Sequence, residues 1–244
     1  MALRTTPRLI LLFAVALLCA CATTPKVPNA RNNYEAGQTA LKSQKYEEAI
    51  EYFKKVKESY SSPELSAQAE LGIADAYFEN KGYIEAAAAY EEFRKLHPTH
   101  PKVPYALYRL GMCNYREVTG IDTDQTPVKN AVATFEGFLA SYPTSEYAAE
   151  VKEKLEDCRN KQLAYEVYVG NFYLRTKKYD SAIKRLTEAL AKFPGRAHDA
   201  TLLRLGEAYL RSGEKVRGTE TLERMLKEYP QSPLVTEARK ELGK

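Results

Sequence analysis

The stretch from Tyr165 to Pro194, YEVYVGNFYLRTKKYDSAIKRLTEALAKFP, decides the fold. Its apolar residues recur at helical spacing on both sides of Lys177-Lys178, which predicts two short amphipathic helices joined by a tight turn. Gly170 and Ala182 are small where the two helices would cross. Pro194 ends the second helix because proline disfavours helix in the residue before it. A helix pair of about 34 residues with this pattern is typical of a tetratricopeptide repeat.

The same spacing recurs along the chain. In four places a small residue of a first helix is followed twelve positions later by a small residue of a second helix: Gly37 and Ala49, Ala74 and Ala86, Gly170 and Ala182, Gly206 and Gly218. One helix pair cannot bury its apolar face alone, so several pairs stack into a solenoid. We therefore predict an all-α tetratricopeptide-repeat solenoid of about five helix pairs with a C-terminal capping helix.

Two repeats depart from the pattern. In the third, Gly111 and Ala131 are twenty positions apart, and the surplus residues form an exposed loop over 118–127, VTGIDTDQTP. Its two aspartates lack the central glycine and distal glutamate of an EF-hand. In the fourth, residues 145–176 contain no proline, which predicts a first helix that begins about four turns before its repeat core.

The N-terminus reads as an export signal. Residues 1–20 combine Arg4 and Arg8 with an apolar run from Leu9 to Ala20 that is shorter than the roughly 20 residues of a membrane-spanning helix. The run ends in Leu-Cys-Ala-Cys, which looks like a lipobox with Cys21 as the lipidated residue. Ala22 after this cysteine favours the outer membrane.

The predicted domain boundaries follow from these signals. They are a lipoprotein signal peptide over 1–20, the lipidated cysteine and a flexible tether over 21–31, N-terminal repeats one to three over 32–143 (32–61, 62–98 and 99–143), and repeats four and five with the capping helix over 144–244.

Charge and motifs argue against several function classes. The chain carries 36 Lys and Arg against 32 Asp and Glu, without the basic stripe expected of a nucleic-acid-binding protein. It has no phosphate loop, nucleophile elbow or His-Glu-x-x-His motif. His97 and His100 lie in a proline-rich turn without the ligand pattern of a metal site. We predict a non-enzymatic protein without cofactor or metal.

Cys113 and Cys158 both fall on apolar faces of neighbouring first helices. An oxidising compartment permits a disulfide between them. Two buried free thiols are the alternative that the narrow geometry of a disulfide favours.

Several stretches are similar to a known family. HPTHPKVPYALYRLGMCNY, DTDQTPVKNAVATFEGFLASYPTSEYA and LAYEVYVGNFYLRTKKYDSAIKRL follow a lipobox within one repeat solenoid. Together they resemble the BamD family, the tetratricopeptide-repeat lipoproteins of the outer-membrane barrel assembly machinery. Thr123 departs from the family, which often has arginine at this place in the loop.

The resemblance implies a scaffold on the periplasmic face of the outer membrane. Its partners would be the POTRA-bearing barrel subunit, other assembly lipoproteins and unfolded β-barrel proteins. Arg185 falls where the family has an arginine that pairs with a POTRA carboxylate; a solvated surface arginine is the alternative.

The N-terminal repeats are the predicted substrate-binding half. Solenoids bind extended peptides along their stacked first helices, and substrate C-termini rich in aromatics suit a groove lined by Tyr34 and Phe78. Both residues have helix-pair core as their other interpretation. Two other functions stay open, a pilus or secretin assembly lipoprotein and a cell-envelope coordinator, although the long loop and the extended fourth helix favour the barrel assembly family.

Overall fold

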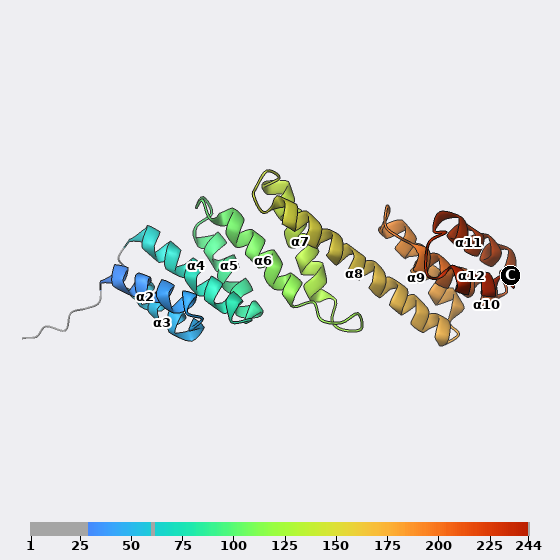
Figure 1. The fold of residues 1–244 in the computed structure, drawn as a ribbon, viewed down its shortest axis with the longest axis horizontal. Helices are drawn as coiled ribbons and strands as arrows, with labels where there is room; N and C mark the ends of the chain where they lie inside the picture. The colour runs from blue at the N-terminus through green and yellow to red at the C-terminus, as the bar shows by residue number, and fades with distance from the viewer. Residues whose placement is uncertain (1–28, 60–61, 244) are drawn as a thin grey trace, which may run out of the picture.

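The computed structural model describes residues 29–59 and 62–243, and every regular element in these ranges is a helix (Figure 1). The helices are α2 Ala30–Lys42, α3 Tyr46–Glu58, α4 Pro63–Glu79, α5 Tyr83–Leu96, α6 Val103–Arg116, α7 Thr126–Ser141, α8 Ala148–Arg175, α9 Tyr179–Lys192, α10 Asp199–Ser212, α11 Lys215–Glu228 and α12 Val235–Glu241. The predicted signal peptide and Cys21 lie outside the described residues.

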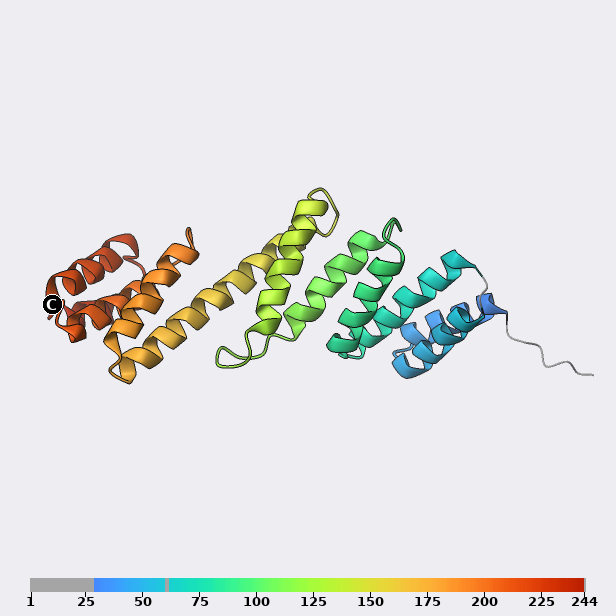
Figure 2. The same cartoon turned by 180° about the vertical axis from the view of Figure 1, so that it is seen from behind.

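The helices form consecutive hairpins that stack side by side along one long axis (Figures 1 and 2). The pairs are α2/α3, α4/α5, α6/α7, α8/α9 and α10/α11, and α12 packs on α11 at the C-terminal end. First helices also contact first helices, as α2 does with α4 and α8 with α10. The predicted all-α repeat solenoid with a capping helix is confirmed.

Helix starts follow capping chemistry. The Ser62 hydroxyl accepts a hydrogen bond from the Leu65 N–H at 3.1 Å, and Pro63 opens α4. Asn29 accepts from the Arg31 N–H at 3.2 Å and starts α2 at Ala30. The first helix therefore begins two residues inside the predicted tether, because Asn29 supplies a cap that the sequence analysis overlooked.

Close helix approach in four of the five pairs depends on a glycine of the first helix lying under a large side chain of the second, whereas α4 has Ala74 at the corresponding place. A Cβ atom added at Gly37 would lie 2.7 Å from the Phe53 ring, and one at Gly206 would lie 2.6 Å from Leu222. The sequence pattern predicts that two small residues face each other where the helices cross. Gly206 and Gly218 do so, because a Cβ atom added at either one would lie 3.3 or 3.0 Å from the carbonyl oxygen of the other. In the first repeat the closest neighbour of the glycine is instead a large residue sixteen positions later.

The turn inside most repeats passes through a left-handed residue. Gln44, Lys81 and Lys177 have φ near +60°, and Gly213 has φ +96°. Each lies five positions before the small residue of its second helix. The tight turn predicted at Lys177-Lys178 is confirmed.

Helix α8 is the long helix that the sequence predicts, with 28 residues from Ala148 to Arg175. Its N-terminal half contributes Val151, Leu155 and Cys158 to a core cluster with α6 and α7. Its C-terminal half pairs with α9. Repeat three is thereby joined rigidly to repeat four. None of the helices within the described ranges combines the length and apolarity needed to cross a membrane.

Two glycines of the third repeat give a matched stability test. A Cβ at Gly111 would overlap the Phe135 ring, whereas one at the exposed Gly137 meets nothing within 4 Å. We expect Gly111→Ala to destabilise the protein by about 1–3 kcal/mol through overpacking. Gly137→Ala should stabilise it by about 0.5–1 kcal/mol through helix propensity. Urea unfolding measures both, and equal effects would contradict the interlock.

Candidate functional site

Arg185, the predicted partner-binding residue, lies on α9 and faces α8. Its guanidinium forms an ion pair with Glu166, and its Cζ atom lies 5.9 Å from the centroid of the Tyr165 ring. Lys192, two turns further along α9, places its Nζ 3.7 Å from the other Glu166 oxygen. The Arg185 side chain is 34% exposed and that of Glu166 14%. Arg185 is therefore held by its own chain at an exposed edge and is not a freely solvated arginine.

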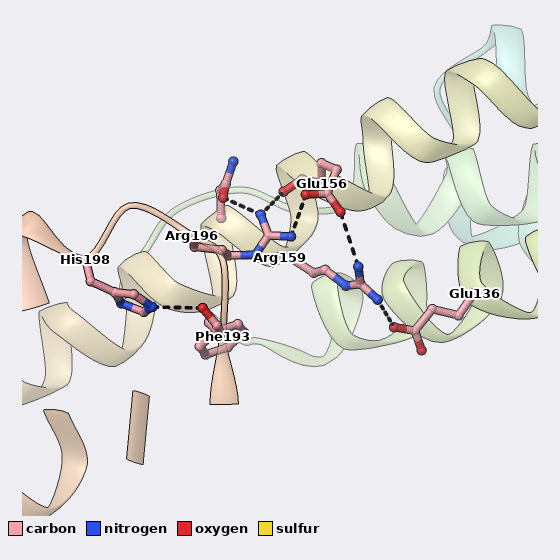
Figure 3. Close-up of polar contacts among 7 residues, drawn as sticks. Glu136, Glu156, Arg159, Phe193, Arg196 and His198 are labelled. Carbon is pink, nitrogen blue, oxygen red and sulfur yellow. Dashed lines mark hydrogen bonds and ion pairs between the residues drawn. The ribbon is translucent and has the colours of Figure 1, made fainter. Parts of the chain in front are cut away.

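A second charged cluster joins the α9–α10 link to α8 and α7 (Figure 3). Arg196 donates from Nη2 to Glu156 Oε2 and from Nη1 to Asn160 Oδ1, both at 2.6 Å. Arg159 donates to Glu156 at 3.2 Å and to Glu136 of α7 at 2.8 Å. These contacts fix the last two repeats against the middle of α8. The sequence analysis missed the bonds of Arg159 to Glu136 and of Arg196 to Glu156 because these partners lie 23 and 40 positions apart.

The two predicted substrate-binding aromatics are partly buried in different parts of the N-terminal half. Tyr34 of α2 packs on Phe53, with ring centroids 5.8 Å apart. Phe78 of α4 meets the Tyr83 ring edge-on at 5.3 Å, and the guanidinium carbon of Arg109 lies 3.7 Å from its centroid. The structure does not bring Tyr34 and Phe78 together, and Arg109 covers one side of Phe78.

Arg109 belongs to a buried polar cluster between repeats two and three. The Asp75 carboxylate of α4 accepts hydrogen bonds from the Tyr90 hydroxyl and, at 2.6 Å, from the Tyr105 hydroxyl. Arg109 donates from Nε to the Tyr90 oxygen at 3.1 Å and from Nη2 to Glu79 at 2.9 Å. Burial raises the pKa of the Asp75 carboxyl above its usual 3.8, while the two tyrosine hydrogen bonds lower it. A desolvated carboxylate that accepts from one tyrosine of α5 and one of α6 fixes the angle between these repeats.

Tyrosine–carboxylate hydrogen bonds connect α6 and α8 in register. The Tyr108 hydroxyl donates to Glu150 and the Tyr115 hydroxyl donates to Asp157, both at 2.8 Å, and both pairs are 42 positions apart. Burial and these carboxylates raise the pKa of each tyrosine to about 12. Both bonds join residues 42 positions apart, and they lie two turns apart on each helix. They therefore hold α6 parallel to α8.

Cys113 and Cys158 are both buried free thiols in the structure, as in the second of the two alternatives. They belong to different core clusters. Cys113 belongs to a core cluster with Tyr90 and Phe93, whereas Cys158 belongs to the cluster of Phe135 and Leu155. Burial raises the pKa of Cys113 to about 12 and that of Cys158 to about 11, which leaves both thiols protonated at neutral pH.

The two histidines of the α5–α6 link each face a glutamate of α4. His97 Nε2 lies 2.8 Å from a Glu70 oxygen, and His100 Nε2 lies 3.5 Å from a Glu64 oxygen. The sequence analysis missed these acids because they precede the histidines by about thirty positions. Within the described ranges, no group of three or more His, Cys, Asp or Glu residues could hold a metal ion.

The surplus loop of repeat three is closed by its own polar side chains. Thr123 Oγ1 donates to the Gly120 carbonyl at 2.7 Å, and Asp124 accepts from the Thr126 N–H at 2.9 Å. Helix α7 begins at Thr126, whose N–H is bonded to Asp124. The helix therefore starts inside the predicted loop of 118–127. The tip exposes Ile121 at 44%.

Known proteins are similar to this chain over most of its length. A family model described as YfiO, outer membrane lipoprotein, matches residues 28–218. Outer membrane protein assembly factor BamD of Vibrio cholerae is 31% identical over 196 residues, which cover 75% of this chain and 81% of that protein. BamD of Caulobacter vibrioides is 27% identical, covering 74% and 59%. The TPR2AB domain of yeast Sti1 superimposes with a TM-score of 0.49 at 13% identity, covering 82% of this chain and 78% of that one.

The Asp75 cluster generates a pH-dependent prediction. Asp75→Asn should destabilise the fold at neutral pH by about 1–3 kcal/mol, because the Tyr90 and Tyr105 hydroxyls lose their carboxylate acceptor. Since the folded-state pKa of Asp75 is raised, the folded wild type takes up the proton first as the pH falls. The wild type should therefore gain stability relative to Asp75→Asn as the pH drops through that pKa, and lose this gain as the pH rises.

Urea titrations of both proteins between neutral pH and the usual pKa of 3.8 measure this difference. Asp122→Asn, which removes a carboxylate from the exposed loop, is the control and should follow the wild type at each pH. Parallel stability curves for wild type and Asp75→Asn would contradict a raised pKa at Asp75.

Proposed function

Because this chain belongs to the YfiO family of outer membrane lipoproteins, whose relatives include outer membrane protein assembly factors, we propose that it is a non-enzymatic scaffold of the barrel assembly machinery. One observation carries this proposal: the family match extends over 28–218 and so includes nearly all of the repeat solenoid. The family match favours this function over a role in pilus or secretin assembly or in cell-envelope coordination. The scaffold helps deliver unfolded β-barrel proteins and insert them into the outer membrane.

The proposed partner surface lies on repeat four. Arg185 is held beside Glu166 and above Tyr165, so little side-chain entropy is lost when a partner carboxylate approaches it. Lys192 shares the same glutamate, which leaves two cations around one anion. This excess of positive charge suits an acidic POTRA surface and would mainly set register and association rate.

The N-terminal repeats are the proposed receiving half for substrates. Tyr34 and Phe78 remain its candidate contacts, although both take part in packing between helices. A substrate that used Phe78 would approach the side that Arg109 leaves uncovered. Other assembly lipoproteins would occupy the remaining surface.

The proposed topology places the solenoid in the periplasm. Residues 1–20 are removed as the signal peptide, and Cys21 carries the lipid. The residues that follow Cys21 tether the solenoid, in which repeats one to three come first and repeats four and five follow. A lipid anchor needs no membrane-spanning helix, since the acyl chains supply the membrane affinity.

Charge exchange distinguishes a partner role of Arg185 from a purely internal one. We expect Arg185→Glu to weaken capture of the POTRA-bearing subunit about tenfold or more, because a like charge then faces the partner acid. The double variant Arg185→Glu with Glu166→Arg restores the internal ion pair but leaves the reversed charge at position 185. If the partner carboxylate binds Arg185 directly, capture of the POTRA-bearing subunit should stay weak in the double variant.

Affinity capture from solubilised envelopes measures this, with thermal unfolding as the check that the solenoid stays folded. Lys129→Glu, which changes an exposed lysine of α7 outside the proposed partner surface, is the control for a general change of charge. Recovery of capture in the double variant would remove Arg185 from the partner surface.

The anchor has a direct test. Cys21→Ser should move the protein from the membrane fraction to the soluble periplasmic fraction, because the thiol that accepts the lipid is lost. Cys113→Ser is the control, since its thiol is buried in the core and makes no contribution to anchoring. Stable membrane attachment of Cys21→Ser would contradict lipid anchoring.

A further inference from the structure

The inner turns of repeats four and five, which join α8 to α9 and α10 to α11, lie at one edge of the solenoid. Consecutive helices run antiparallel and α10 packs on both α8 and α9, so the C-terminal ends of α8 and α10 lie side by side. Figure 1 shows the inner turns of the first four repeats along the lower side of the molecule and the links between repeats along the upper side. We call residues 172–180 and 211–217 the inner-turn edge.

This edge is rich in cations. Its six basic side chains are all exposed, and only two acids accompany them, Asp180 and Glu214. The basic residues are Arg175, Lys177, Lys178, Arg211, Lys215 and Arg217. Arg217 pairs with Glu214 at 2.6 Å, and Arg211 lies 3.9 Å from Glu241. The other four form no ion pair with any residue in the described part of the chain, so the edge carries a net positive charge.

Folding alone does not account for two of these lysines. Lys178 directly precedes α9, and Lys215 is the first residue of α11. The N-terminus of a helix carries a partial positive charge, so a cation there lowers stability and an acid raises it. The first turn of α11 has no acid, whereas that of α3 has Glu47 and Glu48. Lysines in places that favour acids indicate a negatively charged ligand at this edge.

Large apolar side chains lie among these cations. Val216, between Lys215 and Arg217, is 71% exposed, and Phe172 in the last turn of α8 is 54% exposed. Exposed apolar side chains surrounded by cations are typical of protein surfaces that lie on a membrane. The cations attract anionic headgroups, and the apolar side chains enter the boundary between headgroups and acyl chains. This combination favours a lipid surface over a purely charged partner.

We propose that the inner-turn edge of repeats four and five docks on the anionic headgroups of the membrane that holds the lipid anchor, an inference that rests on the anchor proposed at Cys21. The tether permits this arrangement. When extended, the chain from Cys21 to Ala30 reaches about 30 Å, whereas a first helix such as α2 is about 20 Å long. The solenoid can therefore turn its inner-turn edge toward the membrane while repeat one stays anchored. Its long axis then lies along the membrane.

The test uses the full lipidated chain in nanodiscs of phosphatidylcholine, with or without phosphatidylglycerol, that contain a spin-labelled lipid as a fluorescence quencher. A fluorophore is attached at Val216→Cys or, as the control, at Gln231→Cys. Cys113 and Cys158 are buried, so the reagent labels the introduced thiol of the folded chain. Gln231 is exposed and follows the other end of α11, about 20 Å from Val216. In discs with phosphatidylglycerol, quenching at position 216 should exceed quenching at position 231 about threefold or more.

Charge variants identify the contact. Lys178→Glu combined with Lys215→Glu should lower quenching at position 216 to the level at position 231, because two attractive charges become repulsive. Both substitutions place an acid at a helix N-terminus, so the fold is kept. Lys152→Glu combined with Lys227→Glu makes the same change of net charge at exposed residues outside the inner-turn edge and should leave the quenching unchanged. Equal quenching at positions 216 and 231 in the wild type, or equal effects of the two double variants, would overturn the proposal.

An acidic protein surface is the other occupant that the test distinguishes. If position 216 is never quenched and Lys178→Glu with Lys215→Glu lowers capture of the POTRA-bearing subunit about tenfold, the edge belongs to that subunit and the membrane proposal is overturned. A wild type that enters the discs and captures the subunit without quenching at position 216 refutes this inference alone. Loss of wild-type capture refutes the assembly function, and a chain that never enters the discs refutes the anchor.

Discussion

The interlock between a glycine of the first helix and a large side chain of the second, present in four of the five helix pairs, is the constraint on which the solenoid depends. Gly37 lies under Phe53, Gly170 under Leu186 and Gly206 under Leu222, each sixteen positions apart. In repeat three the offset between Gly111 and Phe135 is larger by the eight surplus residues of the loop. Since a Cβ atom has no room at these glycines, the distance between paired helices is set at one point in each of these four repeats. The loop can therefore vary in length without changing how the two helices meet.

A fixed pair geometry gives successive repeats a constant register. Tyr105 and Tyr147 have ring centroids 6.0 Å apart, and their offset of 42 positions is the same as that of the two tyrosine–carboxylate bonds between α6 and α8. Between α4 and α6 the offset is 30, both for Asp75 with Tyr105 and for Glu79 with Arg109. Contacts between repeats thus combine apolar packing, as where Val151 and Leu155 of α8 meet repeat three, with partly buried polar bonds. Polar bonds of this kind specify direction, which sets the angle at which one repeat follows the next.

The sequence predicted what local patterns encode. Helical periodicity, the Ser62 and Pro63 start and the proline-free run through α8 depend on neighbours within a few positions, and the structure has each of them. The Asp75 cluster was not predictable in the same way, because Tyr105 becomes its partner only once the angle between repeats is known. The same holds for Arg185 and Glu166, which lie on different helices, and for Glu70 beside His97. The candidate site could be assigned to repeat four from the sequence, but its internal ion pair required the structure.

Helix α8 contributes side chains to two separate surfaces, because its residues point in different directions around the helix axis. Tyr165 and Glu166 meet Arg185 of α9, whereas Tyr168 and Asn171 line an open groove toward α10. Glu166 and Tyr168 are two positions apart and therefore point to nearly opposite sides of the helix, so a few residues suffice to serve both faces. The N-terminal half of α8 is meanwhile fixed by Tyr108 and Tyr115 of repeat three. A single continuous helix therefore fixes the partner surface, the groove and the N-terminal repeats in one frame. Because α8 is continuous, the distance between these surfaces is set by backbone hydrogen bonds instead of by a hinge.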